Sequence, residues 1–228
     1  MTDRILAEPE KRSAATLAAT LGRMSAPLLV ASLLLALPAS YFFLDRQLAA
    51  LTHPYHDAPF FVGLTYFAAP LTPVGALLAG VLGAKVLAGG ALTERQDKLL
   101  RVCCAILIAG VVTNQLKDVF GRTWPETWVN DNPSYFSNAT YGFFPFHGGQ
   151  GWRSFPSGHA SAISALAGAV WTLWPRLRWL AVAMALAVAV GLLGADYHWL
   201  SDVMAGATIG FATGAVAAKI GGEPRRIS

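Results

Sequence analysis

Residues 99–120 read LLRVCCAILIAGVVTNQLKDVF, and this stretch decides which kind of fold the chain adopts. Its apolar part is long enough for a helix that crosses a bilayer, which needs about 20 mainly apolar residues. Comparable runs precede and follow it, so the sequence predicts an all-α polytopic membrane protein, a bundle of six transmembrane helices. The other five spans are expected at residues 26–44, within 71–92, and at 157–174, 179–195 and 203–220, with a short interfacial helix at 60–69.

The composition of the whole chain also indicates a membrane protein. Of its 228 residues, 54% are hydrophobic and 13% are charged, and the mean hydropathy is +0.47. Soluble domains carry about 25% charged residues, and disordered chains combine low hydrophobicity with high net charge, so both classes are excluded. The net charge is +4, but Lys and Arg lie between the apolar runs rather than in one stripe, which argues against a nucleic-acid partner.

The distribution of basic residues predicts the orientation of the chain. Most of the 17 Lys and Arg residues lie on one side of the predicted spans, which is typical of the cytoplasmic side. Both termini are therefore predicted to be cytoplasmic, with residues 1–25 as a polar N-terminal segment. A signal peptide is the alternative for this basic start, but the apolar run continues through residues 41–43, which favours an uncleaved span. The chain, 1–228, is expected to form a single membrane-embedded domain whose longest outer loop, 121–155, joins spans three and four.

Several polar residues stand at the outer ends of these predicted spans. Lys117 and Arg122 follow the third span, Pro-Ser-Gly-His at 156–159 opens the fourth, and His198 and Asp202 stand at the start of the sixth. Two crossings separate the last two groups, so all of them return to the same face. Charged groups at membrane depth are costly and are kept mainly where they pair or function. We therefore expect one site at the outer face.

Four of these residues suit the binding of a phosphate ester. Ser157 is a favourable N-cap for the fourth helix, and Gly158 lets a ligand approach the backbone closely. The unpaired N–H groups at a helix start form a seat for anions. Lys117 and Arg122 would add fixed positive charge, and an arginine can contact two phosphate oxygens at once.

The two histidines suit covalent phosphoryl chemistry. A neutral imidazole can attack phosphorus and hold the phosphoryl group, while a carboxylate on its other nitrogen sets the tautomer. His198 and Asp202 are four positions apart, which would place them on one face of a continuous helix. His159 is a candidate to protonate the leaving alkoxide and later to activate water. This scheme requires no metal.

At this point the residues resemble a known family. Lys117, the Pro-Ser-Gly-His at 156–159, and His198 followed by Asp202 resemble the three signature motifs of the type 2 phosphatidic acid phosphatase superfamily. This superfamily includes lipid phosphate phosphatases, undecaprenyl pyrophosphate phosphatases and lipid A phosphatases. The resemblance covers most of the chain, because the six spans, the long loop and the order of the motifs agree with it.

The resemblance implies a role for each matching residue. His198 would be the nucleophile, Asp202 its partner and His159 the general acid. The residues that it assigns to phosphate binding are Lys117, Ser157 and Gly158.

The sequence departs from the family pattern at two arginines. The first motif of the family is Lys, six residues, then Arg-Pro, and here Trp124 stands in the place of that arginine. The third motif usually has an arginine six residues before the nucleophile, where this chain has Leu192. We hypothesise that Arg122 and Arg153 replace the two missing arginines as phosphate ligands. The departures indicate a divergent branch of the family.

The resulting hypothesis is metal-independent hydrolysis of a lipid phosphomonoester or pyrophosphate at the outer face, through a phosphohistidine and without a cofactor. The resemblance suggests a substrate of the phosphatidate, phosphatidylglycerophosphate, undecaprenyl pyrophosphate or lipid A type, and a bacterial inner membrane. The expected partners are the lipid phosphate and the bilayer. Two alternatives stay open: a lipid phosphotransferase, and a non-catalytic protein that binds or transports lipid phosphates, which the missing arginines would allow.

Three features remain outside this scheme. His53, His56 and Asp57 resemble part of a metal site, but two histidines and one carboxylate are few ligands for one. His147 is expected to be a structural loop residue. Aromatic residues of the long loop are expected to form an interfacial belt, with an acyl or isoprenoid entrance as the alternative. They include Trp124, Trp128, Tyr135, Tyr141, Phe143, Phe144, Phe146 and Trp152.

Overall fold

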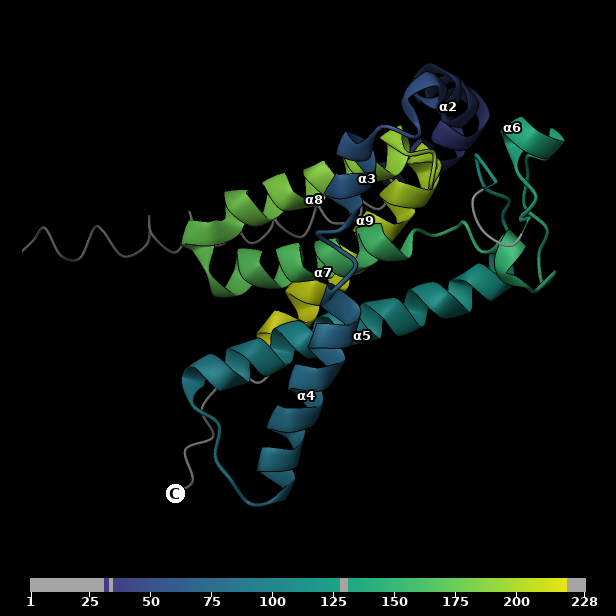
Figure 1. Ribbon diagram of the computed structural model, residues 1–228. Coiled ribbons are helices and arrows are strands. Elements are labelled where there is room, and N and C mark those ends of the chain that lie inside the picture. The colour runs from purple at the N-terminus through teal and green to yellow at the C-terminus, as the bar shows by residue number, and fades with distance from the viewer. Residues whose placement is uncertain (1–30, 33–34, 128–130, 221–228) are drawn as a thin grey trace, which may run out of the picture.

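The computed structural model describes residues 31–32, 35–127 and 131–220, and within these residues every regular element is helical (Figure 1). The predicted all-α class is therefore confirmed, since the described part contains isolated β-bridges but no strand. The predicted N-terminal segment 1–25 and Trp128 lie outside the described residues. In chain order the elements are the π-helix η1 (Ser40–Leu44), α2 (Asp45–Thr52), the 3₁₀ turn η2 (His53–Tyr55), α3 (Pro59–Thr65), α4 (Leu71–Leu87), α5 (Glu94–Phe120), α6 (Tyr135–Asn138), the 3₁₀ turn η3 (Gln150–Trp152), α7 (Gly158–Leu173), the 3₁₀ turn η4 (Pro175–Leu177), α8 (Arg178–Gly194) and α9 (Leu200–Lys219).

Three of the described helices are long and apolar enough to cross a membrane: α5, α8 with the preceding turn η4, and α9. The helices α4 and α7 are shorter, with 17 and 16 residues. The predicted first span lies partly outside the described residues, and its described part, 31–32 and 35–44, is helical. The helix α4 lies within the bounds predicted for the second span and ends at Leu87, after which the chain turns at Gly89 with a φ of 81°. The six-span arrangement stays a prediction.

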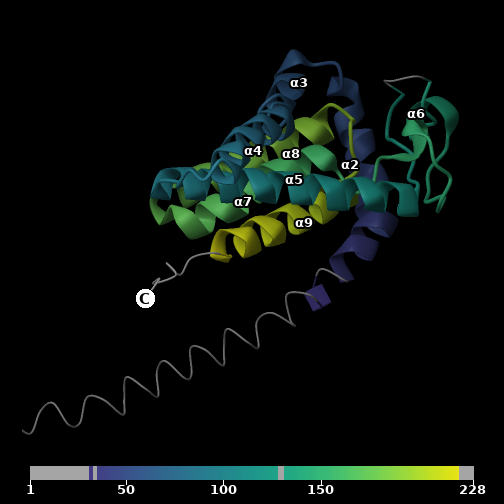
Figure 2. The same cartoon turned by 90° about the horizontal axis from the view of Figure 1, so that it is seen from below.

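The helix α7 lies at the centre of the bundle, in contact with α5, α8 and α9 (Figures 1 and 2). Its contact with α9 is the most extensive, and glycine makes it possible: a Cβ atom on Gly206 would lie only 2.3 Å from the carbonyl oxygen of Ser157. Close backbone approach through small residues is typical of helices that pack in lipid. Two more α9 glycines repeat this contact at four-residue intervals, Gly210 and Gly214.

Large apolar side chains cover the outer surfaces of the bundle rather than only its interior. Leu87 of α4 is 91% exposed and Trp179 of α8 is 70% exposed. Such surfaces are expected where helices face lipid tails, which are as apolar as leucine. The same surfaces include Leu77, Val81, Leu180, Leu186 and Val190.

The long loop after α5 lies at one end of the bundle, and the C-terminal end of α9 lies toward the opposite end (Figures 1 and 2). The helix α5 begins at a capping box formed by Thr93 and Gln96 and ends at Gly121, whose left-handed φ of 56° stops the helix. A side chain at Gly121 would also collide with the carbonyl of Phe144, so the loop folds directly back onto the helix end. This turn brings the loop over the start of α7.

Candidate active site

The N-cap residue of α7 is Ser157, which determines the local structure at the start of the helix. Ser157 is extended, and its hydroxyl accepts a hydrogen bond from the backbone N–H of Ala160 at 3.3 Å. The backbone N–H of Ser157 donates to the carbonyl oxygen of Asp202 at 3.0 Å, which ties the starts of α7 and α9 together. A Cβ atom placed on Gly158 would meet nothing within 4 Å. The first N–H groups of α7 are therefore accessible to a ligand that approaches Gly158.

The second histidine lies at the start of α9 with its carboxylate. His198 and Asp202 are both buried, and Nδ1 of the ring lies 3.4 Å from Oδ2 of Asp202. The same oxygen accepts hydrogen bonds from the hydroxyl of Ser154 at 2.5 Å and from the backbone N–H of Trp199 at 3.1 Å. The carboxylate is thus fixed from several sides, and Nε2 is the ring nitrogen of His198 that remains for a substrate.

These groups meet at one cavity of about 290 Å³. Four of the residues expected from the sequence line it: Lys117 from α5, Gly158 and His159 from α7, and His198 from the turn before α9. Trp124 lies there as well, with its ring centroid 5.1 Å from that of His198. The remaining lining residues are Ala68, Ala69, Thr72, Gly110, Thr113, Asn114 and Ala162. The cavity has a cationic and imidazole-bearing side, while its other walls are mostly small residues of α4, α5 and α7.

Arg122 occupies a different position from the one expected. It is fully buried and outside the cavity lining, and its two terminal nitrogens form ion pairs with Asp45 at 2.6 Å and Asp202 at 2.5 Å. Ser201 joins this cluster, because its hydroxyl accepts from Arg122 at 2.6 Å and its backbone N–H donates to Asp45 at 2.9 Å. With both terminal nitrogens on carboxylates, the guanidinium is aimed at the far side of Asp202 rather than at the cavity.

His198 and Arg122 both contact Asp202, but their surroundings give them different charge states. Burial lowers the pKa of His198 to about 4, against the raising effect of the hydrogen bond with Asp202. Burial also disfavours the charged form of Arg122, but the charges of Asp202 and Asp45 outweigh it and raise the pKa of Arg122 above its ordinary value. At neutral pH the imidazole is therefore unprotonated and the guanidinium is charged.

Arg153 lies at a second cavity, of about 490 Å³, that shares Lys117, Trp124 and Asn114 with the first. Its guanidinium forms an ion pair with Asp118. Its carbonyl oxygen accepts a hydrogen bond from Nζ of Lys117 at 2.6 Å. Arg153 is thus next to the first cavity but is not one of the residues that line it.

Two residues of the site were not singled out from the sequence. Ser154 holds Asp202, and nothing in its loop position sets it apart from other serines. Asp45 could have been identified from the sequence, because it is a carboxylate at the end of an apolar run, where an ionisable group needs a partner. That partner, Arg122, is 77 positions away in the sequence.

Part of the loop aromatics pack around Arg122 instead of forming an interfacial belt. The guanidinium carbon lies 4.8 Å from the ring centroid of Phe143 and 5.5 Å from that of Tyr141. His147 stacks on Trp152 with centroids 3.9 Å apart, as a structural loop residue would. Leu192 is buried, and its carbonyl accepts hydrogen bonds from the backbone of Tyr197 and His198.

Together, the apolar helices and the cavity define a class: an integral membrane protein of helical architecture whose cavity is lined by a lysine and two histidines. The family follows from a comparison of sequences. A profile of the PAP2 superfamily matches residues 98–226, more than half of the chain, and the protein belongs to that superfamily.

Two curated relatives are lipid A 1-phosphatases of Rhizobium johnstonii and Rhizobium etli. Each is 30% identical over 105 residues, 46% of this chain. The matched region spans 40% and 42% of the length of these relatives. The crystal structure of Aquifex aeolicus LpxE is similar in fold, with a TM-score of 0.52, 24% identity, and coverage of 77% of this chain and 95% of that one.

Proposed function

We propose that the protein is an integral membrane phosphatase that hydrolyses a lipid phosphomonoester or pyrophosphate at the outer face of the membrane, through a phosphohistidine. One observation carries this proposal: Lys117, Gly158, His159 and His198 line a single cavity, and His198 is bonded to a buried carboxylate. Membership of the PAP2 superfamily supports it independently.

The first half of the reaction forms a bond between phosphorus and His198. The phosphate sits at the start of α7, where the N–H groups near Gly158 and the ammonium group of Lys117 bind its oxygens. Nε2 of His198 attacks phosphorus while the bond from phosphorus to the lipid oxygen breaks. His159 donates a proton to that oxygen, so the lipid leaves as an alcohol, or as a phosphate from a pyrophosphate substrate.

The second half releases the phosphate. His159, now unprotonated, takes a proton from water, and the resulting hydroxide attacks phosphorus. The phosphorus–nitrogen bond breaks, and inorganic phosphate leaves while the imidazole of His198 is restored. No step of this sequence uses a metal ion.

Asp202 and Arg122 support this chemistry from behind the ring. Asp202 fixes the tautomer of His198 and balances the positive charge that appears on the ring in the phosphorylated state. Arg122 lies between Asp45 and Asp202, so this buried cluster keeps an excess of one negative charge toward His198. We therefore assign Arg122 a positioning role rather than the phosphate contact expected from its place in the sequence.

The substrate is expected to be a lipid with a phosphate at headgroup depth. The cavity lining includes the small residues Ala68, Ala69, Gly110 and Ala162, which suits entry from the bilayer. Because the two curated relatives are lipid A 1-phosphatases, a lipid A 1-phosphate is the first substrate to test. Undecaprenyl pyrophosphate, phosphatidate and phosphatidylglycerophosphate follow.

The test is phosphate release from these four lipids by the purified full-length protein in detergent or vesicles. Wild type is compared with His198→Ala and with a control, His147→Ala, whose side chain is exposed in the outer loop. We expect release by wild type and by the control, and none by His198→Ala. If phosphate passes to an added lipid alcohol instead of water, the protein is a transferase. If lipid binds to wild type and His198→Ala alike and neither releases phosphate, the proposal is wrong and the protein is a lipid-phosphate binder.

A further inference from the structure

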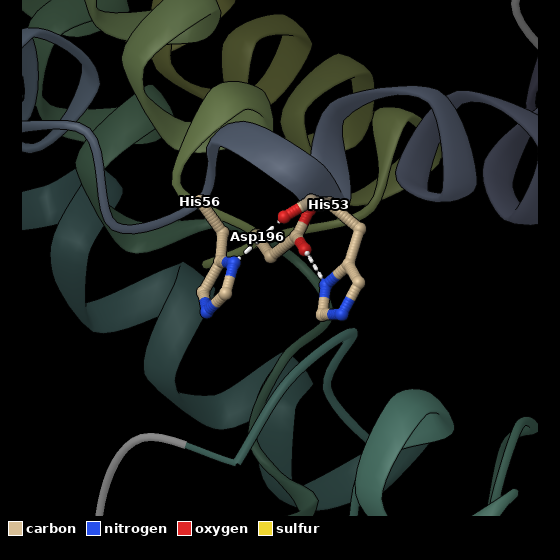
Figure 3. Close-up of side chains that lie close together, drawn as sticks. All are labelled: His53, His56 and Asp196. Atoms are coloured by element: carbon tan, nitrogen blue, oxygen red, sulfur yellow. Dashed lines mark hydrogen bonds and ion pairs between the residues drawn. The ribbon is translucent and has the colours of Figure 1, made fainter.

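A second cluster of histidine and carboxylate lies outside the cavity, between two segments that are far apart in the sequence. His53 and His56 belong to the turn after α2, and Asp196 lies in the turn before α9 (Figure 3). One ligand atom from each of the three residues lies within 4.8 Å of those of the other two. The sequence had grouped the two histidines with Asp57, whose carboxylate lies 3.4 Å from Nε2 of His56 but whose side chain is 93% exposed.

The carboxylate of Asp196 is the fixed member of this cluster. It is buried, and its residue adopts a left-handed φ of 53°, which is uncommon for a residue other than glycine. Its Oδ2 lies 2.7 Å from Nδ1 of His53, and its Oδ1 accepts a hydrogen bond from the hydroxyl of Thr52 at 3.1 Å. A buried carboxylate that is held in place and faces an imidazole resembles a preorganised ligand.

A second carboxylate reaches the same imidazole from the outer loop. Oε2 of Glu126 lies 3.9 Å from Nδ1 of His53. Its other oxygen accepts hydrogen bonds from the backbone of Thr127 and the hydroxyl of Ser137, at 2.5 and 2.6 Å, which orients the carboxylate. Glu126 is outside the group of three whose ligand atoms all lie within 4.8 Å of one another, but at 3.9 Å from His53 it is near enough to supply a fourth ligand.

We propose that His53, His56, Asp196 and Glu126 bind one divalent transition-metal ion of the zinc type. Imidazole ligands favour zinc and its neighbours over Mg²⁺ and Ca²⁺, which prefer oxygen. Tetrahedral zinc with bonds of about 2.0–2.1 Å places its ligand atoms about 3.4 Å apart. The separation between Nδ1 of His53 and the carboxylates, 2.7 and 3.9 Å, brackets this value.

Binding requires a limited rearrangement of the two rings. They are stacked, with centroids 4.7 Å apart and planes at 10°, so their in-plane lone pairs do not converge. The ring of His56 is the one that turns, because its side chain is 31% exposed and Nδ1 is bonded to the carbonyl of His53 at 2.7 Å. On His53, the proton on Nδ1 moves to Nε2, and the ion takes its place facing Asp196.

The consequence is a connection between three parts of the molecule around the active site. Asp196 lies two residues before His198, Glu126 lies two residues after Trp124 of the cavity wall, and His53 follows α2, which carries Asp45. An ion bound to all three segments would fix the outer loop against the turn that carries His198. The site is separate from the chemical steps and stabilises the segments that position them.

The first experiment measures binding directly. Untagged full-length protein in detergent is treated with chelator, exchanged into chelator-free buffer and titrated with ZnCl₂ in a calorimeter. We expect one equivalent to bind to wild type. His56→Gln and Asp196→Asn should each weaken the affinity by roughly tenfold or more, because each removes a ligand. The control His147→Gln removes a histidine of the outer loop that is not one of the proposed ligands, and it should bind zinc like wild type.

Two results would overturn the proposal. One is the absence of stoichiometric zinc binding to wild type, and the other is equal affinity in wild type, His56→Gln and Asp196→Asn. The side chain of His56 is partly exposed, so His56→Gln should fold like wild type and a loss of binding can be attributed to the lost ligand. Each variant is first checked by size-exclusion chromatography.

A second measurement tests the ion class and separates this site from catalysis. Zinc should raise the unfolding temperature of wild type and of His198→Ala by equal amounts, and that of Asp196→Asn by clearly less. Mg²⁺ at the same concentration should leave all three unchanged, and an equal shift with Mg²⁺ would contradict a zinc-type site. Because His198→Ala retains zinc binding, failure of the metal site and failure of the proposed phosphatase activity give different results.

Discussion

Two histidine–aspartate pairs of the described structure, His198 with Asp202 and His53 with Asp196, are surrounded by charges of opposite sign. The first pair is buried, with Arg122 behind the carboxylate and Lys117 across the cavity. The second pair is partly exposed and faces a further imidazole and a further carboxylate. The charges around the first pair therefore favour an anion, and those around the second pair favour a cation.

The comparison shows that the pair itself does not define the chemistry. In both cases a carboxylate faces Nδ1 of a histidine, and the closer contact, 2.7 Å, belongs to the pair outside the active-site cavity. What distinguishes His198, the proposed nucleophile, is that it lines a cavity with Lys117 and the start of α7. The following predictions test that distinction, from the largest expected effect to the smallest.

Replacing the two aspartates by asparagine should separate the pairs most strongly. Asp202→Asn presents an amide to Nδ1 of His198, which favours the wrong tautomer, and turnover should fall by about 10⁴-fold. Asp196→Asn should change turnover by less than about tenfold, since Asp196 touches neither the cavity nor its lining. The measurement is kcat for the best substrate of the lipid panel. Equal losses in the two variants would mean that both pairs take part in the reaction.

The second prediction concerns the ion pair behind Asp202. Arg122→Met leaves two buried carboxylates without their cation and should lower the free energy of unfolding by about 3–5 kcal/mol. Glu126 lies beside the other pair, His53 with Asp196. Glu126→Gln keeps a hydrogen-bond acceptor at this position and should change the free energy of unfolding by no more than about 0.5 kcal/mol. Both are measured by denaturant unfolding in detergent.

A double variant provides the control for this prediction. Asp45→Asn combined with Arg122→Met removes one of the stranded charges and should recover part of the lost stability. If Arg122→Met is as stable as wild type, the buried cluster of Asp45, Arg122 and Asp202 does not have the structural role assigned to it.

Much of the site was predictable because its residues are local in sequence. The N-cap at Ser157 and the position of His159 are fixed by helix geometry, and His198, in the turn before α9, is only four positions from Asp202. The apolar runs likewise predicted an all-helical chain, since each run needs only its own backbone to satisfy its hydrogen bonds.

The partners that bridge distant segments were not predictable in this way. Arg122 was assigned to phosphate because it stands near Lys117, and the structure pairs it instead with Asp45, 77 positions away. His53 was grouped with its neighbour Asp57, whereas its carboxylate is Asp196, 143 positions away. In both cases the tertiary packing of α2 against the outer loop and the start of α9 decides the pairing, and spacing along the chain carries no information about it.

The third prediction compares the hydroxyl groups that hold the two aspartates. Ser154 donates to Asp202 at 2.5 Å inside the protein, and a hydrogen bond to a charged group contributes about 1.5–3 kcal/mol. Ser154→Ala should therefore lower kcat by roughly tenfold or more. Thr52→Ala removes the 3.1 Å hydrogen bond to Asp196 and should leave kcat near the wild-type value, while weakening zinc binding. If Ser154→Ala has the kcat of wild type, the other hydrogen-bond partners of Asp202 are sufficient to position it.

The smallest effect is expected at Arg153, the remaining candidate for a second phosphate-binding arginine. It lies at the cavity next to Lys117, and its guanidinium is paired with Asp118, so contact with phosphate requires that ion pair to open. The competition offsets part of the 1.5–3 kcal/mol of a charge-assisted hydrogen bond, and Arg153→Ala should lower kcat/KM by about tenfold. Asp118→Asn is the matched control: it releases the guanidinium and should leave kcat/KM equal to wild type or higher. If kcat/KM is unchanged in Arg153→Ala, Lys117 and the start of α7 bind the phosphate without any arginine. Fewer residues near His198 then bind phosphate than the family pattern suggests.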